Sequence, residues 1–184
     1  MKTVLLNDIL PEKELYFVYN EIVRSPTWSV GTASTHVEHP SNKHFAGGAQ
    51  FSVKDYNDII LNYPLYFWGQ TLVYRIAKLL EQKNIGMHTK LKRMWFLSTT
   101  TGSPMHFLHQ DDNNNRDYHS ILLFITPVWK TGWRGSFFVD GEEFKFKPGS
   151  AVIFNSSEYH TGEDATSEKY NWQRITLNML VSNK

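Results

Sequence analysis

The chain has 184 residues, of which 41% are hydrophobic and 15% aromatic, and its formal net charge is +1. This length and composition predict one folded domain over residues 1–184. The small net charge gives little attraction for phosphate groups, so we do not expect the protein to bind nucleic acid. Cysteine is absent, which excludes disulfide bonds, thiolate nucleophiles and cysteine-ligated zinc.

No segment has the features of an export signal or a membrane span. The first apolar run is short and is interrupted at Asp8, unlike a signal peptide. No stretch approaches the ~18 apolar residues of a membrane helix. We therefore expect a cytoplasmic protein without a membrane partner, in which any metal would be held by His, Asp or Glu.

Two amphipathic helices are expected in a supporting N-terminal part over about residues 8–86. The first begins near Pro11, with acidic residues in its first turn and apolar residues at helical spacing, and should end near Ser25. The second is expected over about residues 64–82, where an apolar stripe again recurs at helical spacing.

Residues 27–50, between the two helices, predict a long loop with room for short strand segments. They are rich in Gly, Ser, Thr and His and show no sustained period. The irregular spacing of His36, His39 and His44 favours a polar segment over a second metal cluster. Because long loops in compact domains often bind ligands, residues 30–50 are candidates for substrate contact.

From about residue 88 the chain changes to short runs rich in β-branched and aromatic residues, separated by turn signals. Asp140-Gly141 between two aromatic runs is the strongest hairpin signal. Strands are expected over about residues 89–99, 104–109, 119–126, 135–139, 142–146, 150–155 and 173–182. Two helices followed by these strands predict a mainly β (α+β) fold, a sandwich or barrel with helices on one face.

Three residues of the C-terminal half could hold a metal ion. His109 and Asp111 lie two positions apart, so on a strand their side chains share one face. A later strand end could bring His160 to the same place. Two imidazoles and one carboxylate on one face of a metal form the triad typical of non-haem Fe(II), which leaves coordination positions open.

The run around Arg174 points to an anionic ligand. Arg174 and Thr176 alternate with Ile175 and Leu177, so the two polar side chains share one face of a predicted strand. A guanidinium that points into a fold needs an anionic partner. A dicarboxylate that chelates a metal at one end could supply that partner at the other, with the Thr176 hydroxyl as a second donor.

Together, these motifs resemble the 2-oxoglutarate- and Fe(II)-dependent oxygenase superfamily, and within it the prolyl 4-hydroxylase branch. The His-x-Asp motif, the distal His and the Arg-x-Thr motif carry the resemblance. Trp129, the run from Trp133 to Val139 and the Pro148-Gly149 turn with its following apolar strand agree with that branch. The likeness covers about residues 88–182.

The resemblance implies a double-stranded β-helix core, also called a jelly-roll or cupin-like core, over about residues 88–182. It implies Fe(II) bound by His109, Asp111 and His160. It further implies that 2-oxoglutarate and O2 are converted to succinate and CO2 while an unactivated C–H bond is hydroxylated, with ascorbate as a reductant.

The same resemblance assigns the 2-oxoglutarate contacts to Arg174 and Thr176. Many relatives carry a Tyr shortly before the first metal His, and in this chain that place falls within Ser98-Thr99-Thr100-Thr101. Thr99 is the expected substitute, because its hydroxyl can take over the hydrogen bond.

A peptidyl residue, a free amino acid or another small molecule is the expected substrate. Trp133 and Arg134, at the start of a predicted strand near the mouth of the fold, are candidate substrate contacts. Asn113, directly after the metal motif, is a third candidate.

Two other functions stay open. Oxidative demethylation of nucleic-acid bases uses the same iron chemistry, but that branch typically has a second Arg at the place of Leu180. A non-catalytic jelly-roll binding module would keep the fold without the chemistry. The complete set of metal ligands and Arg174 argues against the binding module.

Overall fold

The computed structural model describes residues 1–25, 29–30, 48–54, 62–99, 108–112, 117–163 and 173–182. Its elements in chain order are β1 (Val4–Leu6), α1 (Glu12–Val23), β2 (Ser29–Val30), β3 (Gly48–Lys54), α2 (Tyr63–Glu81), β4 (Lys90–Thr99), β5 (His119–Phe124), β6 (Phe137–Val139), β7 (Glu142–Phe144), β8 (Ala151–Asn155), β9 (His160–Gly162) and β10 (Arg174–Ser182).

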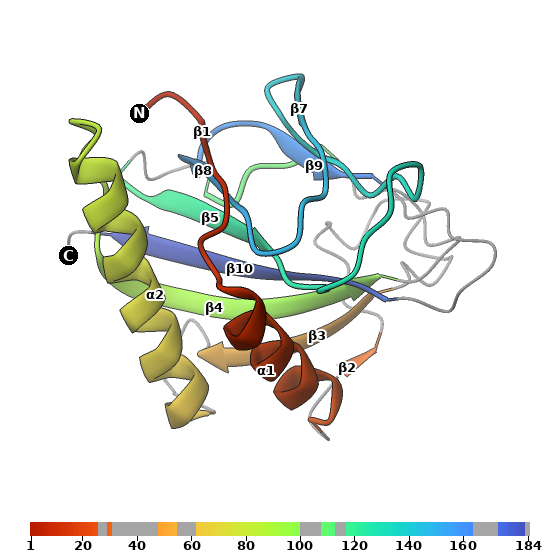
Figure 1. Cartoon of the computed structure of the whole chain (residues 1–184). Coiled ribbons are helices and arrows are strands. Elements are labelled where there is room, and N and C mark those ends of the chain that lie inside the picture. The colour runs from red at the N-terminus through yellow and green to blue at the C-terminus, as the bar shows by residue number, and fades with distance from the viewer. Residues whose placement is uncertain are drawn as a thin grey trace.

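These strands form two antiparallel sheets. The larger has the strand order β1-β8-β5-β10-β4-β3-β2, and the smaller has the order β7-β6-β9. Helices α1 and α2 lie side by side against one face of the larger sheet, which we call the outer face (Figure 1). The smaller sheet packs against the opposite, inner face. The predicted mainly β fold with two supporting helices is therefore confirmed.

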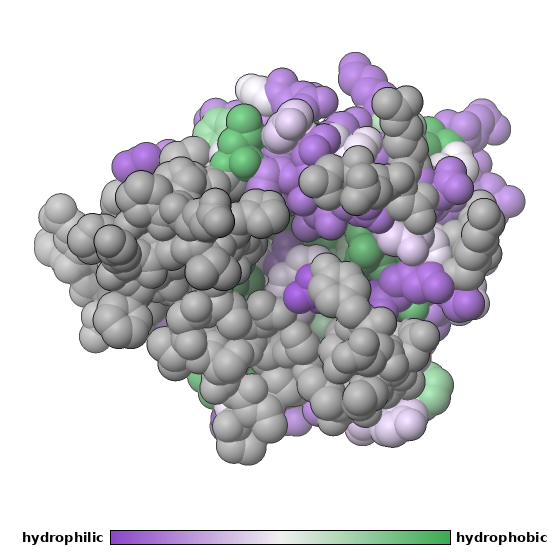
Figure 2. All heavy atoms as spheres, turned by 180° about the vertical axis from the view of Figure 1, so that it is seen from behind, coloured by the Kyte–Doolittle hydropathy of each residue, from purple (hydrophilic) through white to green (hydrophobic). Residues whose placement is uncertain are grey.

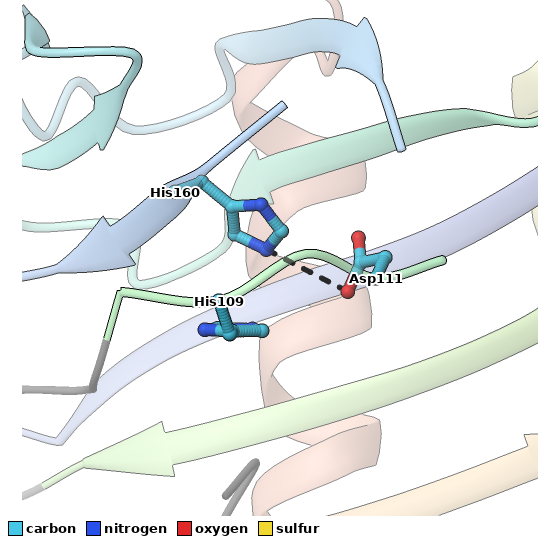
Figure 3. A group of neighbouring side chains, drawn as sticks. All are labelled: His109, Asp111 and His160. Carbon is cyan, nitrogen blue, oxygen red and sulfur yellow. Dashed lines mark ion pairs between the residues drawn. The ribbon is translucent and has the colours of Figure 1, made fainter. Parts of the chain in front are cut away.

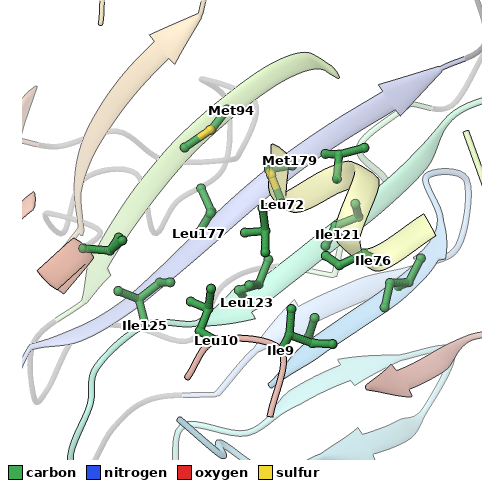
Figure 4. Packing of buried hydrophobic residues seen from close by; sticks show 14 of the residues in the cluster. Ile9, Leu10, Leu72, Ile76, Met94, Ile121, Leu123, Ile125, Leu177 and Met179 are labelled. Carbon is green, nitrogen blue, oxygen red and sulfur yellow. The ribbon is translucent and has the colours of Figure 1, made fainter. Parts of the chain in front are cut away.

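Strand β10 shows how the sequence builds both faces of the larger sheet. Its alternate residues Ile175, Leu177 and Met179 are buried in the hydrophobic core beneath the two helices (Figure 4). Fully burying one such side chain contributes about 1.5–3 kcal/mol. Because successive strand residues point to opposite faces, Thr176 and Asn178 are directed to the inner face.

A second core, rich in aromatic residues, fills the space between the two sheets. The Phe124 and Phe146 rings lie 4.6 Å apart, and the Phe137 and Phe154 rings lie 5.5 Å apart, measured between centroids. Trp129 stacks on Phe146 at 4.2 Å. The inner face is therefore covered by packed rings near β5 and β8.

Glu14 joins the two helices. Its Oε1 accepts a hydrogen bond from the Trp68 indole (2.9 Å), and its Oε2 pairs with Arg75 at 2.8 Å. Helix α2 begins at the Asn62 cap, whose side chain accepts from the Leu65 N–H (3.0 Å). The two contacts of Glu14 hold the helices together as one layer over the sheet.

Both predicted helices are confirmed, with ends within a few residues of those expected. Six of the predicted strands correspond to β4, β5, β6, β7, β8 and β10. Of the strand predicted over 104–109, residues 104–107 lie outside the described residues, and His109 forms an isolated bridge with His160. This hydrogen-bonded bridge positions His109.

Four strands escaped firm prediction. β1 and β9 have three residues each, too few to show an alternating pattern. β2 and part of β3 lie within the expected loop 27–50, so this region adds strands to the supporting helices. The candidate segments around His36, His39 and His44 lie outside the described residues.

In the part of the chain that the structure describes, neither helix is long and apolar enough to cross a membrane. Viewed from behind, the described surface is largely hydrophilic. It is hollowed near its centre, where hydrophobic and hydrophilic residues lie side by side (Figure 2).

His88 and His119 form a stacked pair near the start of β5. Their ring centroids lie 4.3 Å apart at 27°, and the His88 backbone N–H donates to His119 Nδ1 (3.2 Å). His119 is only 8% exposed. Burial, followed by the positive charges of His88 and the amino terminus, lowers the pKa of His119 to about 4.

This depressed pKa predicts a pH-dependent stability. The unfolded chain takes up a proton near pH 6.5, whereas folded His119 resists protonation down to about pH 4. The free energy of unfolding should therefore decrease by on the order of 3 kcal/mol as the pH is lowered from 6.5 to about 4. His119→Asn, which keeps an acceptor for the His88 N–H, should flatten this decline in urea unfolding curves. Equal slopes in the two proteins would contradict the prediction.

Candidate metal centre

The structure brings His109, Asp111 and His160 together (Figure 3). One ligand atom from each residue lies within 4.8 Å of the other two. His160 is buried, and the other two side chains are half-buried. All three groups are donors that a divalent metal accepts, and their ligand atoms lie close enough together to bind one ion.

A backbone bridge produces this arrangement. The His109 N–H donates to the His160 carbonyl (3.0 Å), and the His160 N–H donates to the His109 carbonyl (2.9 Å). The Asp111 N–H donates to the Ser156 carbonyl (3.0 Å). Two segments that are distant in the sequence thus run antiparallel, and the imidazole centroids of the two His residues lie 4.3 Å apart.

His160 is oriented by its surroundings. Its Nδ1 lies 3.0 Å from the Glu158 carbonyl, a contact that requires Nδ1–H as the donor and leaves the Nε2 lone pair for a metal. Phe154 and Phe137 pack near the ring, with centroids at 4.8 and 5.6 Å. The ring is therefore held by both a hydrogen bond and packing.

The charges of Asp111 and His160 stabilise each other. Burial alone would raise the pKa of Asp111, but hydrogen bonding and charge attraction from His160, with a hydrogen bond from Ser120, lower it overall. Burial likewise opposes protonation of His160, yet Asp111 raises its pKa. The Nε2–Oδ1 distance is 3.6 Å. A bound metal would take the place of the proton in this pair.

Ser120 is a site residue that the sequence reasoning missed. Its Oγ donates to Asp111 Oδ2 at 2.5 Å, and Ser120 is only 2% exposed. The available signal was a small polar residue at the head of the apolar run from Ile121 to Ile125.

Arg174, Thr176 and Thr99 lie together on the inner face. Arg174 is directly opposite Thr99 in the β10–β4 register, and Thr176 follows two residues later on β10. All three side chains are buried, and the guanidinium carbon lies 5.6 Å from the Phe146 ring centroid. The three residues predicted to bind one carboxylate are thus brought to one place.

The Gly135 backbone positions the guanidinium. The carbonyl of Gly135 accepts a hydrogen bond from Arg174 Nε (2.9 Å). Gly135 has φ of +84°, and a Cβ there would lie 2.8 Å from Trp129 Cζ2 and 3.4 Å from Arg174 Nε. Glycine is required at this position by both its backbone conformation and the close approach of these side chains.

Two of the predicted substrate contacts lie in the described residues. Arg134 pairs with Glu163 (2.7 Å) and is 53% exposed in its side chain. Trp133 is half-buried and meets Trp129 edge-on at 5.5 Å. Asn113 lies outside the described residues. Contact with a substrate stays a prediction for all three.

Gly135→Ala should lower the free energy of unfolding by about 1–3 kcal/mol, because backbone strain adds to the collision with Trp129. Urea unfolding measures the loss. Gly141→Ala is the matched control, because Gly141 has nearly the same φ (+83°) but nothing within 4 Å of an added Cβ. If both variants lose the same stability, the contact with Trp129 and Arg174 is not a constraint.

Comparison with known proteins supports the fold through structure alone. No family model matches the sequence, and no curated protein matches it. Among solved structures, an oxidoreductase of the 2OG-Fe(II) oxygenase family from Burkholderia pseudomallei has a TM-score of 0.73 at 16% identity, covering 99% of this chain and 85% of that one.

Two prolyl hydroxylases are also similar. The Pseudomonas putida prolyl-4-hydroxylase has a TM-score of 0.64 at 16% identity, covering 98% of this chain and 92% of that one. A prolyl hydroxylase from Trichoplax adhaerens, solved with a hypoxia-inducible factor peptide fragment, has a TM-score of 0.63 at 16% identity, covering 98% and 83%. The chain therefore has the double-stranded β-helix fold of the 2-oxoglutarate- and Fe(II)-dependent oxygenases, the prolyl 4-hydroxylases among them.

Proposed function

We propose that the protein is an Fe(II)- and 2-oxoglutarate-dependent oxygenase that hydroxylates an unactivated C–H bond. The observation that carries this proposal is a pairing of two sites on one fold. A His-Asp-His cluster gathers ligand atoms within 4.8 Å, and a buried Arg174 lies beside Thr99 and Thr176 on the same inner face of the larger sheet.

The donor set fits Fe(II). His109, Asp111 and His160 would hold the ion through two imidazole nitrogens and one carboxylate oxygen, as in the triads that leave positions open for further ligands. When bound, the iron would supply the oxidising chemistry with O2 and 2-oxoglutarate as co-substrates. The chain holds the ligands through the His109–His160 bridge and the Glu158 carbonyl.

The Thr99 environment fits a carboxylate. Thr99 Oγ1 is buried, and it has no hydrogen-bond partner among the residues that the structure describes. A buried hydroxyl without an acceptor costs stability unless a ligand satisfies it. The far carboxylate of 2-oxoglutarate would accept from Thr99 and meet the positive charge of Arg174, whose direction is set by the Gly135 carbonyl.

Aromatic packing would keep water from this end of the site. Phe146 lies against the guanidinium and is stacked by Trp129. In such an apolar environment, the attraction between a guanidinium and a carboxylate is stronger than in bulk water. The inner-face rings therefore support co-substrate binding as well as the fold.

For the substrate, we favour a peptidyl residue, an amino acid or a related small molecule, as in prolyl hydroxylases. The similar Trichoplax adhaerens structure contains a peptide fragment, which supports the peptide option. Trp133, Arg134 and Asn113 are the proposed contacts, and ascorbate is the proposed reductant. Leu180, which is buried, occupies the place where nucleic-acid demethylases carry a second Arg, so that activity is not favoured.

Turnover of 2-oxoglutarate tests the proposal. Purified protein with Fe(II), O2 and 2-oxoglutarate should form succinate, and His109→Ala should reduce the rate by at least about 100-fold, because an incomplete triad binds metal poorly. His88→Ala is a control for loss of a histidine outside the site. Absence of Fe(II)-dependent succinate formation across a panel of peptides and amino acids, together with absence of 2-oxoglutarate binding, would overturn the proposal.

Thr99→Val separates function from stability. Valine keeps the shape but removes the hydroxyl, so the Kd for 2-oxoglutarate should rise by about 5- to 10-fold, as expected for one lost hydrogen bond. Because the hydroxyl has no hydrogen-bond partner in the described part of the chain, the free energy of unfolding should stay equal or rise. Calorimetric titration of 2-oxoglutarate into the Mn(II)-loaded protein, with urea unfolding, measures both. Unchanged affinity would remove Thr99 from the site.

A further inference from the structure

Ser120 is a polar residue in a strand that is otherwise built for packing. All six residues of β5 are buried, and Ser120 lies opposite Phe154 of β8 and Leu180 of β10. Cross-strand neighbours share a face of the sheet, and Phe154 packs against His160. An apolar side chain would suit these two neighbours better than a hydroxyl does.

The hydroxyl distinguishes the two oxygens of Asp111. Ser120 Oγ donates its hydrogen to Oδ2, whereas Oδ1 faces His160 Nε2 at 3.6 Å. A serine has one hydrogen to donate, and a carboxylate can only accept. Oδ2 is therefore held by a hydrogen bond from the β5 side, and Oδ1 is the oxygen directed toward His160.

Other contacts near Asp111 hold its backbone rather than its carboxylate. The N–H groups of Asp111 and Asp112 both donate to the Ser156 carbonyl, at 3.0 and 3.2 Å. These bonds leave rotation about the Asp111 side-chain bonds unrestrained. Within the described part of the chain, the carboxylate contacts Ser120 and His160, and the His160 nitrogen is itself a metal ligand candidate. Ser120 is thus the partner that remains when a metal binds.

We infer that Ser120 is a positioning residue that restricts Asp111 to bind the metal through Oδ1 alone. Binding through one oxygen keeps coordination positions open for a chelating co-substrate. A rotated carboxylate could place both oxygens on the metal and occupy one of these positions. The purpose of this restraint rests on the proposed oxygenase function, but the restraint itself requires only a metal in the cluster.

Two substitutions of similar shape test the inference. Ser120→Thr keeps the hydroxyl, and Ser120→Val has a methyl group where threonine has the hydroxyl. Ser120→Ala is a smaller variant that also lacks the hydroxyl, for use if valine impairs folding. The probe is Co(II), whose visible absorption weakens as its coordination number rises. Calorimetry gives the Kd for Co(II) and then the Kd for 2-oxoglutarate on the Co(II)-loaded protein.

The threonine variant should match the wild type in spectrum and in both affinities. The valine or alanine variant should show weaker absorption bands or a Kd for Co(II) raised about 10-fold, the scale of lost support around a metal ligand, with 2-oxoglutarate bound more weakly. Ser150→Ala is the matched control, because Ser150 is also buried but its hydroxyl bonds Asn7 instead of the site. It should leave the Co(II) measurements unchanged.

The inference is overturned if folded Ser120→Val and Ser120→Ala bind Co(II) and 2-oxoglutarate like the wild type with the same spectrum. It is also overturned if Ser120→Thr is impaired as much as Ser120→Val. These measurements need no turnover, so a failure of the proposed oxygenase activity is distinguishable. If the wild type forms no succinate but the Co(II) spectrum still depends on the Ser120 hydroxyl, only the proposed activity is overturned.

Discussion

The backbone bridge between His109 and His160 is the constraint on which the candidate site depends. Each residue donates its N–H to the other's carbonyl, so main-chain hydrogen bonds bring the two imidazoles together. His109 and Asp111 are tied to each other by sequence spacing, but His160 reaches them only through this pairing. The smaller sheet supports it, because Val139 of β6 pairs with His160 of β9.

The hydrophobic core under the helices positions Arg174 and Thr176, which are proposed to bind the co-substrate carboxylate. Leu177 and Met179 are buried on the outer face, and this burial fixes the register of β10 because a slip by one residue would turn them away from the helices to the inner face. The same slip would turn Arg174 and Thr176 toward the helices. The apolar residues therefore determine indirectly where the co-substrate carboxylate could be bound.

Buried polar groups gather on the inner face at a cost to stability. Arg174, Thr99 and Ser120 are all at most 5% exposed, and polar groups in such positions cost free energy unless they are hydrogen-bonded. Ser120 is satisfied by Asp111, whereas Thr99 Oγ1 has no hydrogen-bond partner within the described ranges. This pattern is expected where a fold reserves hydrogen-bonding groups for a ligand.

The sequence by itself determined the two helices and most of the strands, because periodicity is a local property of the chain. It also supplied, through motif spacing and family resemblance, the residues proposed to bind the metal and the co-substrate carboxylate. The three-residue strands β1 and β9 were decided only by pairing with β8 and β6. The roles of Ser120 and Gly135 also emerged only in three dimensions. Their partners, Asp111 and Arg174, lie on other segments, and no local pattern records which side chains will meet across two sheets.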